Sequence, residues 1–180
     1  MTTPAERFVS QSADYLAGDY LPRIARCLAQ LEEADVWWRP NEASNSIGNL
    51  ILHLMGNARQ WILSGVAGRP DDRRRQEEFD RRAPIPKAEL LRRLDQTVAE
   101  VAAAIRAVGV DRLLEPRLIQ GYDTTVLGAI YHVVEHFSMH TGQIILLAKA
   151  RTGGDLGFYD VKHGIARPNW ARSAEGVPLD

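Results

Sequence analysis

Residues 126–147, VLGAIYHVVEHFSMHTGQIILL, decide the fold that we predict for this chain. Apolar side chains recur in this stretch at helical spacings, mostly of three, four and seven residues. They are Val126, Ala129, Ile130, Val133, Val134, Phe137, Ile144 and Leu147. Thr124 or Thr125 can cap the start of this helix, and Gly153 and Gly154 follow its end. The stretch therefore predicts a long amphipathic helix with one face in a core.

Three earlier segments carry the same periodicity. The first covers residues 6–34 and contains Pro22, which should kink or split the helix because proline removes a backbone donor. The second covers residues 47–62, and the third covers residues 90–108. Four helices with one apolar face each are most simply buried in an all-α four-helix bundle.

The remaining segments are expected to lack regular structure. Charged residues dominate the connection at 69–82, and residues 110–123 form a second connection. We expect the bundle to occupy residues 1–150. Residues 151–180 are rich in Gly, Pro and polar side chains, which predicts an irregular C-terminal extension packed on or near the bundle. None of these segments shows the alternation that is typical of a strand.

The composition is that of a globular protein of one domain. Of the 180 residues, 45% are hydrophobic and 25% are charged. The formal net charge of -1 argues against nucleic acid or an anionic membrane as a partner. No stretch approaches the ~20 apolar residues of a membrane span, and no signal-peptide pattern is present, so we expect a cytoplasmic protein. The lone Cys27 excludes a multi-cysteine metal site and is predicted to be a core residue.

Three histidines are spaced four residues apart on the last predicted helix. Because side chains four apart stack on one face, two of these imidazoles can bind one metal ion. On a helical wheel centred on Val126, His140 lies about 40°, His136 about 80° and His132 about 120° from the apolar stripe. His136 and His140 are therefore the predicted ligands, and His132 is a structural or neighbouring histidine.

A third ligand is expected from the helix at 47–62, where His53 lies on the polar edge of the stripe. Three histidines would leave a coordination position free, which is typical of a catalytic metal site. The alternative is that these histidines are hydrogen-bonded groups at the edge of a helix interface. Four polar residues could orient the imidazoles or be ordinary helix edges: Asn57, Gln60, His132 and Gln143.

Three stretches resemble one known family. Residues 45–54 (NSIGNLILHL), 135–144 (EHFSMHTGQI) and 72–79 (DRRRQEEF) are similar to stretches of the DinB-like (YfiT-like) helical-bundle superfamily, in an uncharacterised branch. The resemblance implies a four-helix bundle, often dimeric, with a divalent ion held by three histidines. Transferred by motif, the ligands are His53, His136 and His140.

The resemblance also implies candidate activities. Some members are thiol S-transferases that use low-molecular-weight thiols, so we expect zinc or nickel, a small-molecule thiol and an electrophilic substrate, in a homodimer. The alternatives are a hydrolase with a metal-bound water and a non-enzymatic metal-binding stress-response bundle. For hydrolysis we find no general base, because Glu135 falls opposite the apolar stripe.

Two further features admit two interpretations each. The arginines at 73–75 could recognise a carboxylate-bearing cosubstrate, but the acidic residues around them favour a solvated charged loop. Tyr122 and Asp123 could reach the mouth of a pocket, but a turn is favoured.

Overall fold

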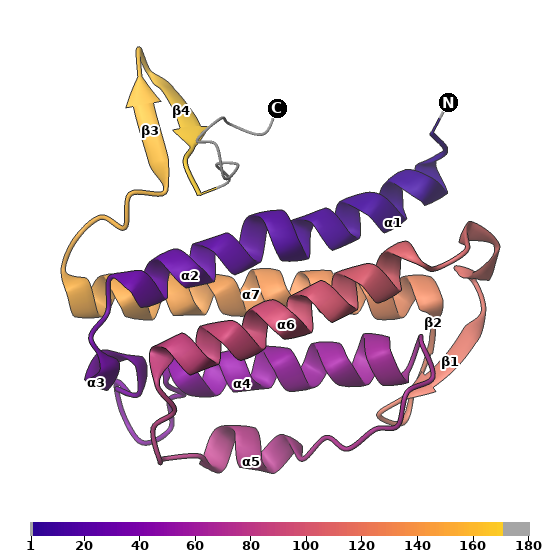
Figure 1. The fold of residues 1–180 in the computed structure, drawn as a ribbon, viewed down its shortest axis with the longest axis horizontal. Coiled ribbons are helices and arrows are strands. Elements are labelled where there is room, and N and C mark those ends of the chain that lie inside the picture. The colour runs from indigo at the N-terminus through magenta and orange to yellow at the C-terminus, as the bar shows by residue number, and fades with distance from the viewer. Residues whose placement is uncertain (1, 171–180) are drawn as a thin grey trace.

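The computed structural model describes residues 2–170 and is mostly helical (Figure 1). Its α-helices in chain order are α1 (Pro4–Asp14), α2 (Leu21–Ala29), α3 (Glu33–Val36), α4 (Ile47–Ala58), α5 (Arg75–Asp80), α6 (Lys87–Arg106) and α7 (Val126–Thr152). Two of these continue through π-helical turns, so the described chain has four long helical segments. α6 packs against α1 and α4, and α7 packs against α2 and α4. The apolar stripes predicted from the sequence meet in the core between them.

The first long segment is not broken at its proline. α1 and α2 are joined by a π-helical turn, Tyr15–Tyr20, and the Leu21 N–H donates to the carbonyl of Leu16, five residues back. Pro22 comes directly after this turn, so the backbone N–H that proline lacks is missing at the point where the hydrogen-bond register changes. The expected kink or split is therefore a change of hydrogen-bond register within a continuous helix.

A π-helical turn also extends α4. It covers Arg59–Ser64, so the second long segment runs from residue 47 to residue 64. Ser46 caps its start, because its side chain accepts the Asn49 N–H while the Asn49 side chain accepts the Ser46 N–H. π-turns inside helices occur frequently at functional sites.

The connection expected at 110–123 is wrong in part, because it contains a β-hairpin. β1 (Pro116–Ile119) pairs antiparallel with β2 (Tyr122–Thr125). The turn residues Gln120 and Gly121 both have positive φ, 55° and 80°, which is typical of a two-residue hairpin turn. The hairpin leads directly into α7, whose N-cap is Thr125. The connection at 69–82 likewise contains a short helix, α5, beside α4.

The C-terminal segment, expected to be irregular, is so only in part, because a β-hairpin follows the irregular residues 153–158. β3 (Tyr159–Lys162) pairs antiparallel with β4 (Ile165–Pro168). The preceding Leu156 and Phe158 are buried, and Arg26 of α2 donates to the Gly157 carbonyl. In Figure 1 this hairpin lies on the α1–α2 side of the molecule. The predicted extension also includes residues 171–180, which lie outside the described residues.

Among the helices of residues 2–170, none has the length and apolar character that a membrane crossing requires. Cys27 is fully buried in the core, and burial raises the pKa of its thiol to about 12. This agrees with the predicted structural role, because such a thiol is not ionised at neutral pH.

Candidate metal centre

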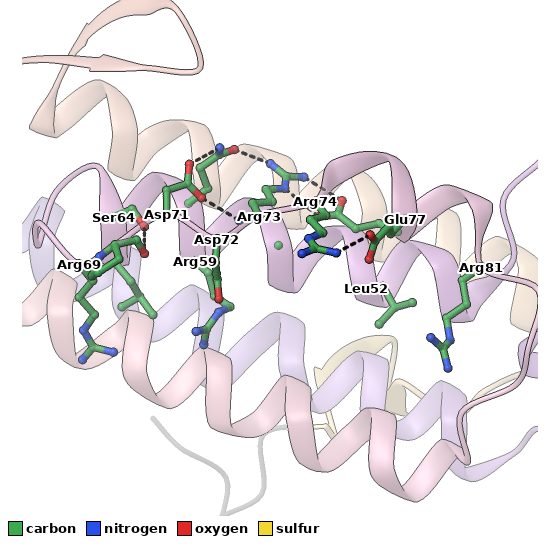
Figure 2. Close-up of a pocket in the computed structure, with 15 residues that line it drawn as sticks. Leu52, Arg59, Ser64, Arg69, Asp71, Asp72, Arg73, Arg74, Glu77 and Arg81 are labelled. Atoms are coloured by element: carbon green, nitrogen blue, oxygen red, sulfur yellow. Dashed lines mark hydrogen bonds and ion pairs between the residues drawn. The ribbon is translucent and has the colours of Figure 1, made fainter.

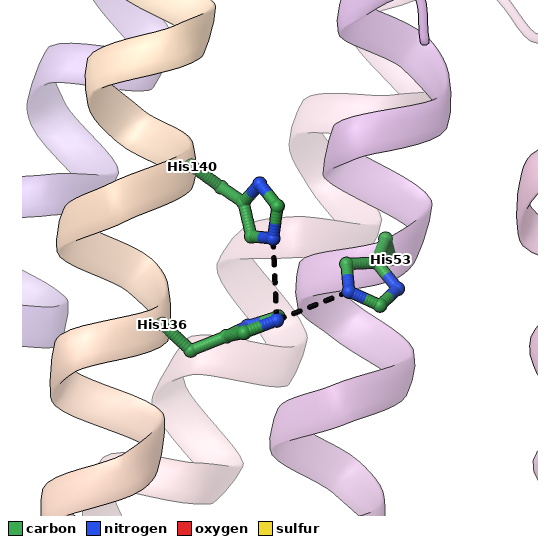
Figure 3. Close-up of side chains that lie close together, drawn as sticks. All are labelled: His53, His136 and His140. Carbon is green, nitrogen blue, oxygen red and sulfur yellow. Dashed lines mark hydrogen bonds between the residues drawn. The ribbon is translucent and has the colours of Figure 1, made fainter. Parts of the chain in front are cut away.

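Three histidines from two helices converge between α4 and α7 (Figure 3). The Nε2 atom of His136 lies 3.0 Å from Nε2 of His53 and 3.2 Å from Nε2 of His140. One nitrogen from each ring falls within a set whose members are no more than 4.8 Å apart. His53 is buried, whereas His136 and His140 are partly buried. The structure thus brings together the three residues that the spacing and the resemblance selected.

Hydrogen bonds fix the tautomers of two of these rings. The Nδ1–H of His53 donates to Oε2 of Glu78 over 2.9 Å, and the Nδ1–H of His140 donates to Oε1 of Gln143 over 2.7 Å. With the proton on Nδ1, each ring turns a bare Nε2 lone pair toward His136. Three Nε2 atoms therefore face a common point. Of these, only Nε2 of His136 can carry a proton, which it would donate to one of the other two rings.

The surroundings favour neutral imidazoles. Burial, together with the neighbouring His140 and His53, lowers the pKa of His136 to about 3. Burial also lowers the pKa of His140, although its bond to Gln143 acts in the opposite direction. Neutral imidazole is the form that ligates metals, so these shifts of the pKa favour a cation at His136 and His140.

A buried ion pair holds His53 in place. Arg73 donates from Nε to Oε1 of Glu78 over 2.7 Å and from Nη2 to Oε2 over 2.9 Å, a two-point contact. The side chains of Arg73 and Glu78 are only 4% and 10% exposed. Burial alone would raise the pKa of the Glu78 carboxyl, but the bonds and charges of Arg73 and His53 outweigh burial and lower this pKa. Glu78 is therefore an ionised acceptor for His53.

Two features of α4 make room for this pair and anchor it. At Gly56 a methyl group would overlap the Glu78 carboxylate, so the absence of a side chain lets the carboxylate approach the helix. The Asn49 side chain donates to the carbonyl of Glu78 over 2.7 Å and to that of Arg81 over 3.2 Å. These bonds tie α5 to α4 and place Glu78 beside His53.

Sequence reasoning missed Glu78 and favoured solvent for Arg73. The signal available was the stretch 72–79, which the resemblance singled out without assigning a role to either residue. On the six-residue helix α5, Glu77 is exposed while its neighbour Glu78 is buried. From the sequence of this charged stretch alone, one cannot tell whether Glu77 or Glu78 faces the protein interior.

The other candidate residues have separate partners. The Asn57 side chain lies 3.1 Å from Nε2 of His132, whose ring stacks on Trp61 with centroids 3.8 Å apart. His132 in turn lies beside His136, at 5.4 Å between ring centroids. Gln60 accepts from Arg73 and donates to Asp71. Of the four residues proposed to orient imidazoles, Gln143 is the one that bonds to a ring of the triad.

A cavity of about 330 Å³ opens beside the triad. Its walls come from α4 and the following π-turn, the first residue of α5, the connection before α5, the β1–β2 hairpin and α7. The lining residues are His53, Asn57, Trp61, Arg73, Arg75, Gln120, Tyr122, His132 and His136. Tyr122 thus reaches the pocket, although the sequence favoured a simple turn. A second cavity, of about 320 Å³, reaches Arg73 and Glu78 but is lined by none of the histidines (Figure 2).

The residues present fit a divalent ion. Zinc–imidazole bonds of about 2.0–2.1 Å in a tetrahedral arrangement separate two ligand nitrogens by about 3.3 Å. The two Nε2 separations at His136 are close to this value, and the set of three nitrogens spans no more than 4.8 Å, so small movements of the rings would complete the arrangement. The bond from His53 to Glu78 is the carboxylate–histidine pairing that orients metal ligands in proteins. Three histidines of this arrangement can hold a metal ion; its identity is a separate question.

Comparison with known proteins places the chain in a family and a fold. The crystal structure of a DinB-like protein from Bacillus cereus ATCC 10987 is similar at a TM-score of 0.60 and 14% identity, over 76% of this chain and 88% of that one. The predicted DinB-like fold is thereby confirmed. A search of curated proteins finds no match. The family described as "Protein of unknown function (DUF1572)" matches residues 5–164. This match spans most of the sequence, so the chain belongs to the DUF1572 family.

Proposed function

We propose that this protein is a metal-dependent enzyme whose ion, zinc or nickel, is held by His53, His136 and His140. The observation that carries the proposal is the convergence of three imidazole nitrogens beside a cavity of about 330 Å³. A site that only stores metal has no need of a cavity next to its ligands. Three protein ligands leave a coordination position for a substrate atom, as in catalytic sites.

The proposed reaction is transfer of a low-molecular-weight thiol onto a small electrophile. The thiol sulfur forms a bond to an electrophilic carbon, the leaving group departs with its bonding electron pair, and the thiol proton passes to solvent. A divalent ion at the triad would lower the pKa of the thiol and so supply thiolate at neutral pH. Within the chain, Glu78 and Gln143 keep His53 and His140 oriented, and the aromatic rings of Trp61 and Tyr122 form cavity walls for the electrophile.

Hydrolysis by an activated water is supported less well. That reaction benefits from a carboxylate free to act as a general base. Both oxygens of Glu78 already accept bonds from Arg73, and one also accepts from His53. Glu135 is exposed on α7, as expected from the sequence. Thiol transfer needs no such base, because ionisation of the thiol already supplies the nucleophile.

We also propose that the four long helical segments act as a four-helix bundle that pairs into a homodimer through α7. Tyr131, Met139 and Leu146 are 61%, 51% and 68% exposed on this helix. Their spacing of eight and seven residues places them on one side of α7, and apolar stripes of this kind are typical of helix interfaces. Sedimentation of the wild type and of Leu146→Lys tests the dimer: the wild type should sediment as a dimer and the variant as a monomer.

Metal content and turnover test the enzyme proposal. Single variants His53→Ala, His136→Ala and His140→Ala should each lose most of their bound metal by elemental analysis, whereas His132→Ala should keep it. Wild-type protein should convert thiol and electrophile pairs from a broad panel, and a chelator should abolish the conversion. Near-stoichiometric metal in all four variants would contradict the ligand assignment. Metal binding without turnover across the panel would favour the non-enzymatic alternative.

A further inference from the structure

Five basic side chains line the cavity beside the triad. They are two arginines, Arg73 and Arg75, and three histidines. No carboxylate is among the described residues that line this cavity, and its two guanidinium groups carry a permanent positive charge.

Only one of these two guanidinium groups is available. Arg73 is neutralised by its two-point contact with Glu78. Arg75 is exposed and, within residues 2–170, has no carboxylate partner. Its neighbour Arg74 differs, because Arg74 pairs with Glu77 at 3.2 Å and lines the other cavity. Arg75 thus offers an uncompensated fork of N–H donors at the cavity wall.

Ring contacts hold Arg75 near the triad. Its guanidinium carbon lies 4.9 Å from the centroid of the Phe79 ring, a cation–π contact. The Phe79 ring in turn packs on His53, with centroids 4.7 Å apart. A single aromatic ring therefore separates the guanidinium from the first of the three histidines. An anion held by Arg75 would extend into the same cavity that the histidines border.

We propose that Arg75 binds the carboxylate of a small anionic substrate whose uncharged part lies between Trp61 and Tyr122. A single planar guanidinium matches a monoanionic carboxylate, whereas a phosphate dianion would call for a second free cation, and Arg73 is already paired. The aromatic walls suit an apolar or aromatic body. This inference gives the substrate class of the proposed enzyme and rests on the same cavity, but anion selection by Arg75 does not depend on the reaction.

Binding of a matched pair of probes tests the inference. The probes are 3-phenylpropionate and its neutral analogue 3-phenylpropionamide, titrated into metal-free and zinc-loaded protein and followed by NMR. Wild-type protein should bind the acid about tenfold more tightly than the amide in both states. Arg75→Gln should bring the two probes to near-equal affinity, and Arg75→Lys should restore part of the preference. Arg74→Gln removes the same charge one residue away and should behave as wild type.

The outcomes separate this inference from the proposed function. Equal binding of acid and amide by the wild type, no detectable binding of either, or an acid preference that survives Arg75→Gln would overturn the role of Arg75. An acid preference lost equally in Arg74→Gln would overturn it as well, since it would reflect overall charge. If the protein holds no metal yet keeps an Arg75-dependent preference, the anion site stands and the enzyme proposal fails. Metal content of Arg75→Gln should equal that of wild type.

Discussion

Removal of the Glu78 charge should weaken metal binding and destabilise the fold by separable amounts. Glu78 accepts the Nδ1–H of His53 and neutralises Arg73, whose side chain is 4% exposed. Loss of a carboxylate that orients a histidine ligand typically lowers metal affinity about 10- to 100-fold. Loss of one partner of a buried ion pair costs about 3–5 kcal/mol, and we expect roughly 3 kcal/mol because Glu78 retains some exposure.

The assay is zinc affinity by competition with a chelator, together with urea unfolding of the metal-free protein. Glu78→Gln should show both effects. Glu77→Gln removes a neighbouring exposed charge that pairs with Arg74 alone, and it should show neither. These two variants separate the local role of Glu78 from the general charge of α5.

A double variant separates orientation from stability. Replacing both partners, Arg73→Met with Glu78→Leu, removes the stranded charge and should recover most of the lost free energy of unfolding. Zinc affinity should remain low, because the Nδ1–H of His53 still has no carboxylate acceptor. Wild-type zinc affinity in Glu78→Gln, or recovery of affinity in the double variant, would refute the view that Glu78 orients His53.

Three further predictions concern the same network. Gly56→Ala should lower zinc affinity much as Glu78→Gln does, because the new methyl displaces the Glu78 carboxylate; the chelator competition measures this, and unchanged affinity would contradict the steric argument. The metal-free protein should become less stable as the pH is lowered from about 6.5 to about 3. The pKa of His136 is about 3 in the folded protein, so over this range the unfolded chain binds more protons than the folded one. This contribution is constant above pH 6.5, and urea unfolding across pH should show a shallower fall in His136→Gln than in the wild type. Gln143→Leu should reduce zinc affinity by less than Glu78→Gln, since Gln143 is exposed and uncharged; a larger loss would reverse the proposed ranking of the two acceptors.

The long helices and the meeting of the histidines could be predicted because both depend on local periodicity. Spacing of four residues puts His136 and His140 on one face of α7 wherever that helix packs. The apolar stripes of α4 and α7 allow these helices to pack side by side, and the resemblance also selected His53; in the structure the two helices do contact each other. The position of His132 outside the triad could also be predicted from its angle on the helical wheel. In the structure its ring contacts Asn57 and Trp61.

The two hairpins were missed because each strand is only four residues long. Four residues hold two inward and two outward positions, too few to distinguish alternation from a loop. The better signal lay in the turns, Gln120-Gly121 and His163-Gly164, where both residues adopt positive φ. A glycine preceded by a polar residue between short β-prone runs would have indicated a hairpin in each case. The first of these hairpins bears on the proposed function, because it carries Tyr122 to the cavity.

The ion pair behind His53 could not be predicted by any periodicity, because its burial is decided by contacts across the chain. Whether Glu77 or Glu78 faces inward depends on how α5 is rotated against α4. That rotation is set by the Asn49 side chain, which binds two carbonyl groups about thirty residues away, and by the space above Gly56. A glycine in the middle of a helix is unfavourable for the helix itself, and the Asn49 side chain in the first turn reaches beyond its own capping contact. In α4 they serve a neighbour instead, and such residues in an otherwise apolar helix are the sequence feature that points to a buried polar partner.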